Sequence, residues 1–359
     1  MGKTNACALL NLTSGCLCAL LFAAGAPEAC AQEPSRVVAI TFDDLPYAGR
    51  IGESPGALSV DDVAALNARV RSVLAEARAP ATGFVVEQTA AGLGEARWAV
   101  LREWTTGNLT LGNHSYSHSD INQLTSGQIE DEIVRGEISI RPLMVAAGKP
   151  LRFVRFPQNH TGDTEAKRDA ISAMLSARGY IAAASTIDTS DYQFEAAYSI
   201  ALAAEDEECA TRIREAYLAF SAAKIDYYVA LNLEVLGRAP AEIALLHLNQ
   251  INADTLPELL DLYRARGFGF VSLETAHADP AYASPNTFVS PYGPMWGYRW
   301  AKDQGVRVDG SKDSDPPAWL AAYATGASHC GDAHQSIGAG ETQAGNLLQH
   351  TSFIARTRQ

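Results

Sequence analysis

Cysteine and positive charge are both scarce in this chain, and each shortage removes a class of function. Four of the six cysteines in 359 residues lie within the first 31, which leaves Cys209 and Cys330. Two isolated cysteines do not make a cysteine-ligated zinc site, although they can pair in an oxidising compartment. The 28 basic and 41 acidic residues give a net charge of -13, and no Lys/Arg-rich run is present. Binding to a phosphate backbone has no electrostatic basis, so nucleic acid is not expected as a partner.

Long hydrophobic runs are limited to the N-terminus. Lys3 is followed by an apolar, small-residue stretch at 6–26 and then by Ala29-Cys30-Ala31. This order is typical of a secretory signal peptide over residues 1–31, with a mature chain that begins near Gln32 and is periplasmic or extracellular. The alternative is an uncleaved membrane anchor, which the polar and glycine residues of the stretch disfavour. We expect no transmembrane segment in the mature chain.

From Arg36 onward, short β-branched or apolar runs alternate with longer helical patterns, as in βα units around a largely parallel sheet. Strands are expected at 37–42, 82–86, 109–112, 151–156, 180–186, 243–248 and 268–273. Helices are expected at Val60–Ala79, with Ser59 as N-cap, and at Ser126–Ala147 after Leu124-Thr125. About seven βα repeats favour an α/β fold with a closed or nearly closed barrel over an open doubly wound sheet.

Three later segments depart from this alternation. The stretch 194–236 is too long for a simple crossover and has the pattern of two amphipathic helices, which we interpret as an insertion beside the barrel. After Ala276 an irregular segment rich in proline and tryptophan is expected to pack on the barrel. Residues 326–359 are rich in Gly, Ser and Gln, which predicts disorder. The predicted organisation is a signal peptide at 1–31, one domain at 32–325 and a disordered tail.

The first expected strand runs into two adjacent carboxylates, Asp43 and Asp44. Because successive residues of a strand point to opposite faces, one carboxylate can bind a metal while the other stays free to move a proton. The alternative is a turn-forming pair before Pro46, which is a common use of aspartate. The carboxyl ends of parallel barrel strands meet on one face, where active sites are built.

The third strand runs into His114 and His118, two of only eight histidines in the chain. If a helical turn begins there, the spacing of four places both imidazoles on one face, where they can share a metal. Hydrogen-bonded structural histidines are the alternative. One carboxylate with two imidazoles leaves coordination positions open, as a catalytic zinc site requires, although the same set also serves non-haem iron.

Three further strand ends carry polar groups. Arg155 follows the fourth strand, where a fixed guanidinium can hold a carboxylate by a bidentate pair or can be a surface arginine. Arg152, three residues earlier, is expected to face the opposite side. Asp191 and Tyr192 follow the fifth strand, and His247 lies in the sixth. A histidine in an apolar strand is either a hydrogen-bonded core residue or, at a strand end facing a carboxylate, a general acid.

Taken in chain order, these groups form a series of five motifs. They are Thr41-Phe42-Asp43-Asp44, His114-Ser115-Tyr116-Ser117-His118, Arg155-Phe156-Pro157, Asp191-Tyr192 and Leu245-Leu246-His247. The series resembles the ordered motifs of the polysaccharide deacetylases, the enzymes of carbohydrate esterase family 4 built on the NodB-like homology domain. The resemblance covers about 36–276. It implies a distorted (β/α)7-8 barrel that removes acetyl groups from an acetylated glycan, with N-acetylglucosamine-type glycans favoured.

The resemblance also implies which residues bind the metal and which residue acts as the general base, and we call these residues the metal side of the site. Asp44, His114 and His118 would bind a divalent metal, which we expect to be Zn²⁺. Asp43 would be the general base, and Arg155 would orient it. The metal would supply an activated water at neutral pH.

On the acid side, the resemblance implies that His247 is the general acid, that Asp191 pairs with it, and that Leu245 lines the pocket for the acetyl methyl group. Two positions depart from the family pattern. Gln158 stands where an aromatic residue usually follows the proline of the third motif, but the oxyanion donor there is a backbone N–H, so that role survives the change. Tyr192 stands where tryptophan is common, which alters the pocket wall and the expected substrate preference.

Other functions fit parts of this pattern. An O-acetyl esterase acting on a glycan such as xylan would use the same groups. A non-haem iron oxygenase would use the same three ligands but has no required part for His247. A glycan-binding relative without activity would use the aromatic segment 292–300, although the intact site residues argue against lost catalysis. A glycosidase needs two opposing carboxylates, whereas Asp43 and Asp44 are adjacent.

Overall fold

A computed structural model describes residues 36–54, 56–284 and 286–330 of the chain. The predicted signal peptide and residues 331–359 of the predicted disordered tail lie outside these ranges. Within them, no helix combines the length and the apolar character that crossing a membrane requires.

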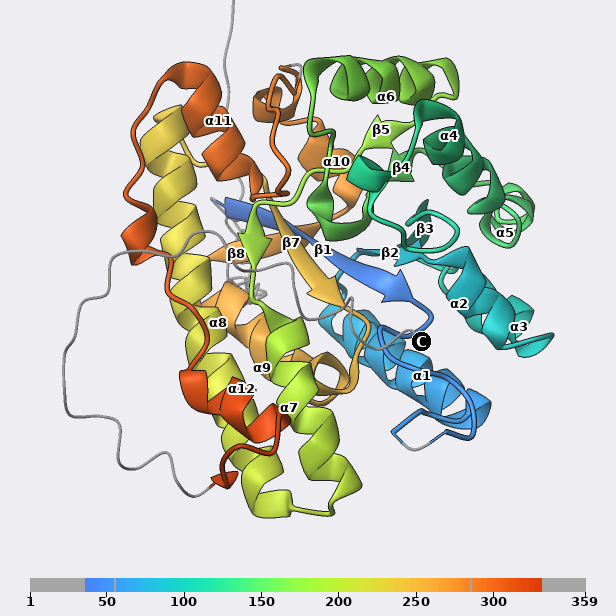
Figure 1. Ribbon diagram of the computed structural model, residues 1–359, viewed down its shortest axis with the longest axis vertical. Helices are drawn as coiled ribbons and strands as arrows, with labels where there is room; N and C mark the ends of the chain where they lie inside the picture. Colours follow the sequence, from blue (N-terminus) through green and yellow to red (C-terminus); the bar gives the residue numbers. More distant parts are fainter. Residues whose placement is uncertain (1–35, 55, 285, 331–359) are drawn as a thin grey trace, which may run out of the picture. The chain divides into compact units, whose positions relative to one another are not determined.

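The core of the fold is a sheet of eight parallel strands (Figure 1). The strands are β1 (Arg36–Leu45), β2 (Ala81–Val85), β3 (Leu109–Asn113), β4 (Phe153–Val154), β5 (Ile181–Ala182), β6 (Ile187–Asp188), β7 (Glu242–His247) and β8 (Phe268–Val271). Their order is β5-β4-β3-β2-β1-β7-β6, and β8 pairs with the beginning of β1. The sheet curls into a half-barrel, so the predicted distorted (β/α)7-8 barrel is confirmed.

β1 is the central strand, and it is buried on both faces. Val38, Ala39, Ile40 and Phe42 are at most 1% exposed, so consecutive residues on opposite sides of the strand are equally covered. This pattern is typical of a parallel strand with structure packed against both faces. The register places Asp43 of β1 opposite His247 of β7, which brings two expected site residues to neighbouring positions.

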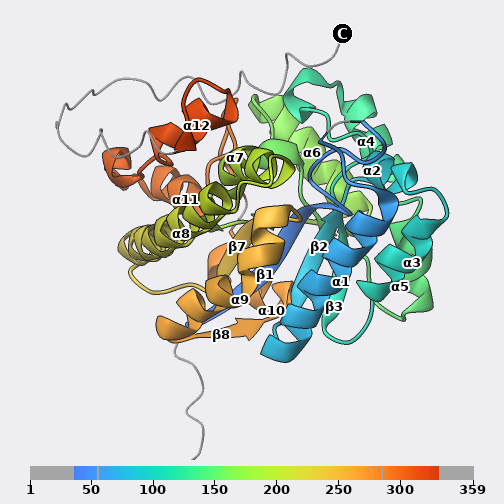
Figure 2. The ribbon, with the colours of Figure 1, turned by 90° about the horizontal axis from the view of Figure 1, so that it is seen from below.

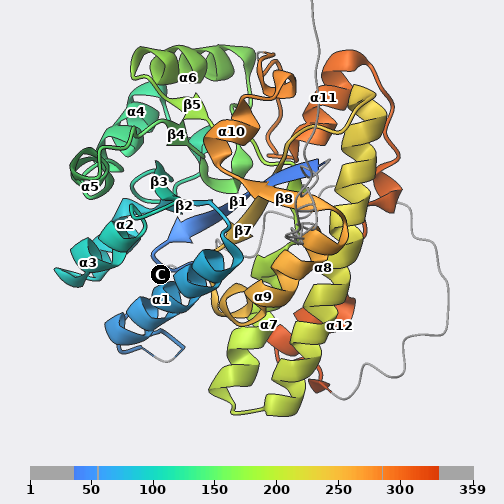
Figure 3. The ribbon, with the colours of Figure 1, turned by 180° about the vertical axis from the view of Figure 1, so that it is seen from behind.

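Twelve α-helices accompany the described strands. They are α1 (Val60–Ala77), α2 (Glu87–Gly92), α3 (Ala96–Glu103), α4 (Ser126–Arg135), α5 (Ile140–Ala146), α6 (Glu165–Ala177), α7 (Asp191–Ala203), α8 (Glu207–Leu236), α9 (Gln250–Ala265), α10 (Leu273–His277), α11 (Trp296–Gln304) and α12 (Ala318–Ala324). α1 and α9 pack side by side (Figure 2), and α10 lies beside β1 on the side shown in Figure 3.

Helix starts follow the local sequence closely. Ser59 caps α1 and Thr125 caps α4, and each forms a capping box with the residue three positions later, so the expected start points are confirmed. The single helix expected at 126–147 is wrong, because the chain forms α4 and α5 with a break that begins at Gly136. A Cβ on Gly136 would lie 2.4 Å from Oδ1 of Asn113 at the end of β3, so this point must pass close to the sheet.

The single strand expected at 180–186 is also wrong, because two short strands occupy this region. The amide of Ala183 still donates to the carbonyl of Val154 in β4, whereas the amide of Thr186 donates to the carbonyl of Ile243 in β7. Between these two residues the chain leaves one end of the sheet and joins the other. Among the described strands β5 and β6 do not pair with each other, and the half-barrel stays open at this point.

The region predicted as a helical insertion contains α7 and α8, which share a second apolar core with α12 (Figure 1). Phe194, Tyr198, Tyr217 and Leu320 are each at most 2% exposed in this core. Cys209 in α8 forms a disulfide with Cys330, so the two cysteines outside the predicted signal peptide are paired. The segment after α10 therefore packs along α7 and α8, where α11 contacts α8 and α12 contacts α7.

Candidate metal centre and active site

The end of β1 places Asp43 against a buried arginine. Arg155 is 1% exposed, and its Nη1 donates to Oδ1 of Asp43 at 2.7 Å and to Oγ1 of Thr41 at 2.8 Å. Its Nη2 donates to the carbonyl of Ala184 at 2.9 Å. The expected bidentate pair is wrong, since the guanidinium is shared among three oxygens. Arg152 is exposed and forms an ion pair with Glu274, so the expected opposite orientation of the two arginines is observed.

Asp44 faces away from this arginine toward two imidazoles. Its Oδ1 lies 3.4 Å from Nε2 of His114 and 3.2 Å from Nε2 of His118. The two imidazole centroids are 5.2 Å apart. Asp44 has φ 63°, in the left-handed region. The divergence of the two carboxylates therefore does not come from strand alternation alone, because the chain leaves the extended conformation at Asp44.

Residues 114–118 do not form the helical turn that would place both imidazoles on one helix face. This segment is an irregular loop in which Ser115 has φ 70° and His118 has φ 57°. Left-handed conformations at non-glycine residues cost of order 1–3 kcal/mol each and persist only where the surroundings hold them. Glu132 of α4 supplies that support, because its carboxylate accepts the amides of Tyr116 and Ser117 at 3.0 and 2.8 Å. The histidine spacing alone did not predict Glu132.

The orientation of His114 follows from its other ring nitrogen. Nδ1 lies 2.6 Å from the carbonyl oxygen of Arg155, which can only accept, so Nδ1 carries the proton and donates. Nε2 is then left with a lone pair directed toward Asp44. Such a bond to the far nitrogen is the usual way in which a protein fixes a metal-binding histidine.

The cluster has the properties of a cation site. One atom each from Asp44, His114 and His118 lies within 4.8 Å of the other two. Oδ1 of Asp44 is buried and accepts no hydrogen bond. Burial would raise the pKa of Asp44, but the neighbouring His118 and His114 lower it well below its usual range. A buried carboxylate oxygen and two imidazole nitrogens that converge on one point fit a divalent metal.

The acid side of the site is a buried histidine–carboxylate pair at the ends of β6 and β7. Oδ1 of Asp191 lies 2.7 Å from Nδ1 of His247, and Oδ2 accepts the backbone amide of His247 at 2.6 Å. The side-chain amide of Asn252 also donates to Oδ2. Burial favours the neutral imidazole, but the charge and hydrogen bond of Asp191, with smaller contributions from Asp44 and Asp43, raise the pKa of His247 to about 10.

The three expected substrate-binding residues lie around these groups. Leu245 is buried in β7 two residues before His247, so both side chains point to the same side of the strand. Tyr192 is 47% exposed, and its ring centroid lies 5.9 Å from that of His247. Gln158 is exposed within a short 3₁₀ turn, Pro157–Asn159, and has φ 57°.

Sequence reasoning missed two further polar contributors besides Glu132. Thr41 accepts from Arg155 and donates to the carbonyl of Ala244 at 2.6 Å, which ties β1 to β7 below the site. Its position two residues before Asp43, and therefore on the same side of the strand, is a signal that could have found it. Asn252 lies 61 positions after Asp191. No local pattern connects these two residues.

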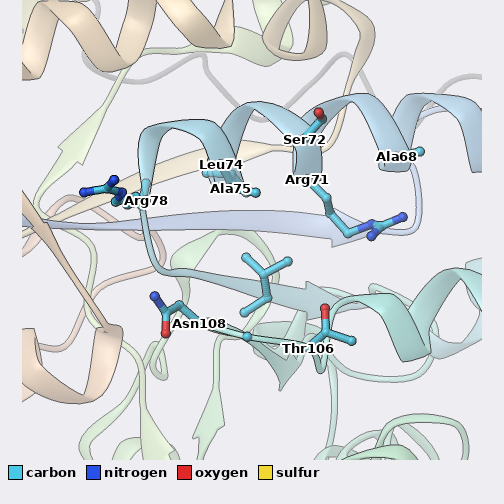
Figure 4. Close-up of a pocket in the computed structure, with 11 residues that line it drawn as sticks. Ala68, Arg71, Ser72, Leu74, Ala75, Arg78, Thr106 and Asn108 are labelled. Atoms are coloured by element: carbon cyan, nitrogen blue, oxygen red, sulfur yellow. The ribbon is translucent and has the colours of Figure 1, made fainter.

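A separate pocket lies beneath α1 (Figure 4). Its lining residues are Ala68, Arg71, Ser72, Leu74, Ala75, Arg78, Ala79, Thr106, Gly107, Asn108 and Leu109. The pocket is next to the amino ends of β2 and β3, whereas the histidine cluster follows the carboxyl end of β3. The pocket is therefore not part of the candidate active site.

Part of this chain is similar to known proteins. Residues 31–174 match the family model of the polysaccharide deacetylases. A family 4 carbohydrate esterase from Streptomyces lividans is 17% identical, with 68% of this chain and 97% of that chain covered and a TM-score of 0.43. The peptidoglycan deacetylase PdaC from Bacillus subtilis is 19% identical, with 68% and 92% covered and a TM-score of 0.42.

A family 4 pseudoenzyme from Bacillus anthracis is also similar, at 15% identity with 68% of this chain and 66% of that chain covered and a TM-score of 0.45. No curated protein matches the chain. Residues 31–174, which include Asp43, Asp44, His114, His118 and Arg155, are therefore similar to the polysaccharide deacetylases. Activity has to be argued from the residues of this chain.

Proposed function

We propose that the protein is a metal-dependent hydrolase that removes acetyl groups from an acetylated polysaccharide or oligosaccharide, with N-acetylglucosamine-type glycans favoured. The observation that carries this proposal is the pairing of Asp43 with His247 at neighbouring positions of β1 and β7. Strands in a sheet are about 4.8 Å apart, so a proton acceptor and a proton donor flank one small space beside the Asp44 cluster.

Asp44, His114 and His118 are the residues that would hold the metal, and we propose Zn²⁺ because one carboxylate and two imidazoles form a catalytic zinc ligand set. When bound, the ion would supply Lewis-acid chemistry and would lower the pKa of a bound water toward about 7. The buried Oδ1 of Asp44, which accepts no hydrogen bond, is the feature of this chain that most needs such a partner.

Asp43 is the proposed general base. Its Oδ1 is held by Arg155 at 2.7 Å, and Oδ2 lies 3.8 Å from Nε2 of His114, on the side of the metal ligands. One oxygen is therefore fixed while the other can accept a proton from the attacking water. The three hydrogen bonds of Arg155 keep this carboxylate oriented during the step.

His247 is the proposed general acid. Asp191 holds Nδ1, which leaves the Nε2 proton for the leaving nitrogen or oxygen of the sugar. The raised pKa keeps this proton on the ring at neutral pH, so the acid is present while Asp43 is free to act as base. Acetate and the deacetylated sugar are the products.

The tetrahedral oxyanion needs a donor, and we propose the backbone amide of Gln158 for this role. Removal of one oxyanion donor in other hydrolases costs about 2.7–4 kcal/mol of transition-state stabilisation. Leu245 would receive the acetyl methyl group, because it is buried on the same side of β7 as His247. The exposed Tyr192 would form the outer wall toward the sugar.

Acetate release by the mature protein of known metal content, measured on a panel of N-acetylated and O-acetylated glycans, tests the proposal. We expect turnover on at least one glycan, loss of turnover on chelation and recovery when Zn²⁺ is restored. Asp43→Asn is the control, because it should keep the metal and lose activity. Glycan binding without acetate release from any member of the panel would identify the chain as a non-catalytic relative.

We also propose that the protein is exported and acts outside the cytoplasm. The support is the Cys209–Cys330 disulfide, since structural disulfides persist in oxidising compartments. Fractionation of expressing cells and N-terminal sequencing of the product test this proposal. A cytoplasmic protein with its first residues intact would contradict it.

A further inference from the structure

The turn at Pro157–Asn159 contains two successive residues in a disfavoured backbone conformation. Gln158 has φ 57° and Asn159 has φ 58°, and neither residue is glycine. Side chains clash with the backbone in this region, so such residues hold their conformation only where several contacts fix them. The contacts that fix this turn come from a part of the chain about 140 residues later.

Arg299 in α11 makes the largest of these contacts. Its side chain is 1% exposed, and its three nitrogens donate to three different oxygens. Nη2 donates to the carbonyl of Asn159 at 2.6 Å, and Nη1 donates to Oγ1 of Thr161 at 2.7 Å. Nε donates to the carbonyl of Pro294 at 2.9 Å. The guanidinium therefore links Asn159 and Thr161, at the end of the turn, to Pro294 in the segment before α11.

The surroundings of Arg299 indicate that its role is geometric rather than ionic. Its guanidinium carbon lies 4.0 Å from the centre of the Trp296 ring, and no carboxylate pairs with it among the described residues. Burial lowers its pKa to about 9. Burying a cation without a counter-charge costs free energy. The property that an apolar side chain could not supply is the set of N–H donors with fixed directions.

A second contact in the same place closes the turn against the C-terminal segment. The side-chain amide of Asn159 donates to the carbonyl of Gly293 at 3.3 Å. A Cβ on Gly293 would lie 2.0 Å from the carbonyl oxygen of Gln158, so the two backbones are in direct contact. The segment around 293–299 therefore packs onto the residue whose amide we assign to the oxyanion.

We propose that Arg299 is a positioning residue for deacetylation, which holds the 157–161 turn so that the amide of Gln158 points toward the reacting carbonyl. The inference rests on the proposed function. It adds a contribution from the C-terminal segment, which lies outside all five sequence motifs. A displacement of about 1 Å in a catalytic group can cost about 10²-fold in rate, so the loss of these three bonds is expected to affect turnover.

Arg299→Met tests the proposal, and Arg168→Met is the matched control. Arg168 also holds the C-terminal segment, because its Nη1 donates to the carbonyl of Thr287 at 2.8 Å, and its side chain makes no hydrogen bond to residues 157–161 of the described chain. In Arg299→Met we expect kcat to fall by roughly 10- to 100-fold, with KM changed by less than about threefold and zinc content unchanged. The control should keep its kcat. Hydrogen exchange of the peptide covering 157–161 should become faster in Arg299→Met alone.

Thr161→Val keeps the guanidinium of Arg299 and removes one of its three hydrogen bonds. This variant tests the proposal if Arg299→Met does not fold. Its kcat is expected to fall by roughly 2- to 10-fold. Full kcat in a folded, zinc-loaded Arg299→Met or in Thr161→Val would overturn the inference while leaving the proposed function intact. A wild-type chain that releases no acetate would overturn the proposed function and the catalytic part of the inference, and unchanged exchange at 157–161 would overturn the structural part.

Discussion

The metal side of the site, at the ends of β1 and β3, differs from the acid side, at the ends of β6 and β7, in how its polar atoms are satisfied. On the metal side, Oδ1 of Asp44 is buried between His114 and His118 and accepts no hydrogen bond. On the acid side, the carboxylate of Asp191 accepts from His247 twice and from Asn252 once. Under the proposed function, a metal ion completes the first half, whereas the hydrogen bonds of the second half are made within the protein.

Because of this difference, we expect substitutions in the two halves to have different effects on metal content and activity. Removing a metal ligand should lose both the ion and the activity, because nothing else completes that half. Removing the acid should lose activity and keep the ion.

The His114→Ala/His118→Ala double variant should lose stoichiometric zinc, and acetate release should fall by about 10⁴-fold or more, because the activated water is lost. Metal analysis and acetate assays check both parts. Glu132→Gln is a useful companion, because it should keep the ligands while weakening the loop that holds them. A folded double variant that retains one zinc per chain would remove the two histidines from the site.

His247→Ala should lower kcat by roughly 10² to 10⁴ and leave the zinc content unchanged, because general acid catalysis alone is lost. The loss should be smaller on an activated aryl acetate, whose leaving group needs little protonation. Comparing kcat on the natural glycan with kcat on the aryl ester makes the measurement. Equal impairment on both substrates would instead indicate a structural histidine and break the contrast between the two halves.

Arg155→Ala should lower kcat by about 10- to 100-fold with less effect on zinc affinity, because Asp43 loses the bond that orients it. Removing one partner of a buried ion pair is also destabilising, by about 3–5 kcal/mol, so the variant should unfold at a lower temperature. Arg152→Ala is the matched control, since that side chain is exposed and pairs with Glu274. Equal activity in the Arg155 variant would contradict its assignment.

Asp191→Asn should shift the alkaline limb of the rate profile to lower pH. His247 must be protonated to act, and its raised pKa of about 10 preserves the proton well above neutrality. Without the charge of Asp191, burial pulls this pKa down. By the same linkage, the pair stabilises the fold fully below about pH 6.5 and loses that stabilisation as the pH rises through about 10 in the wild type.

Kinetic pH profiles and thermal unfolding at several pH values check the Asp191 prediction. Asn252→Ala provides a graded comparison, because it removes one donor to Asp191 and leaves the charge in place. An alkaline limb that does not move in Asp191→Asn would break the proposed pair.

Local sequence patterns were enough to predict most of the strands and helices and the order of the polar residues at the strand ends. Apolar runs placed six of the eight described strands to within a few residues, and Ser59 and Thr125 marked helix starts because capping is a local interaction. Arg155 and Arg152 were expected on opposite sides because side chains of a strand alternate. These properties depend on neighbours in the chain, which a sequence pattern can report.

Tertiary structure alone decided the conformations that oppose local preference. The left-handed residues at Asp44 and His118 are what bring carboxylate and imidazole together, and Glu132 supports the loop from another helix. The splitting of 180–186 into two strands depends on which partner strand each half meets. The three bonds of Arg299 to residues far away in sequence hold the turn at Gln158. A conformation that is costly locally persists only through such distant contacts, and for that reason no pattern within the chain could predict it.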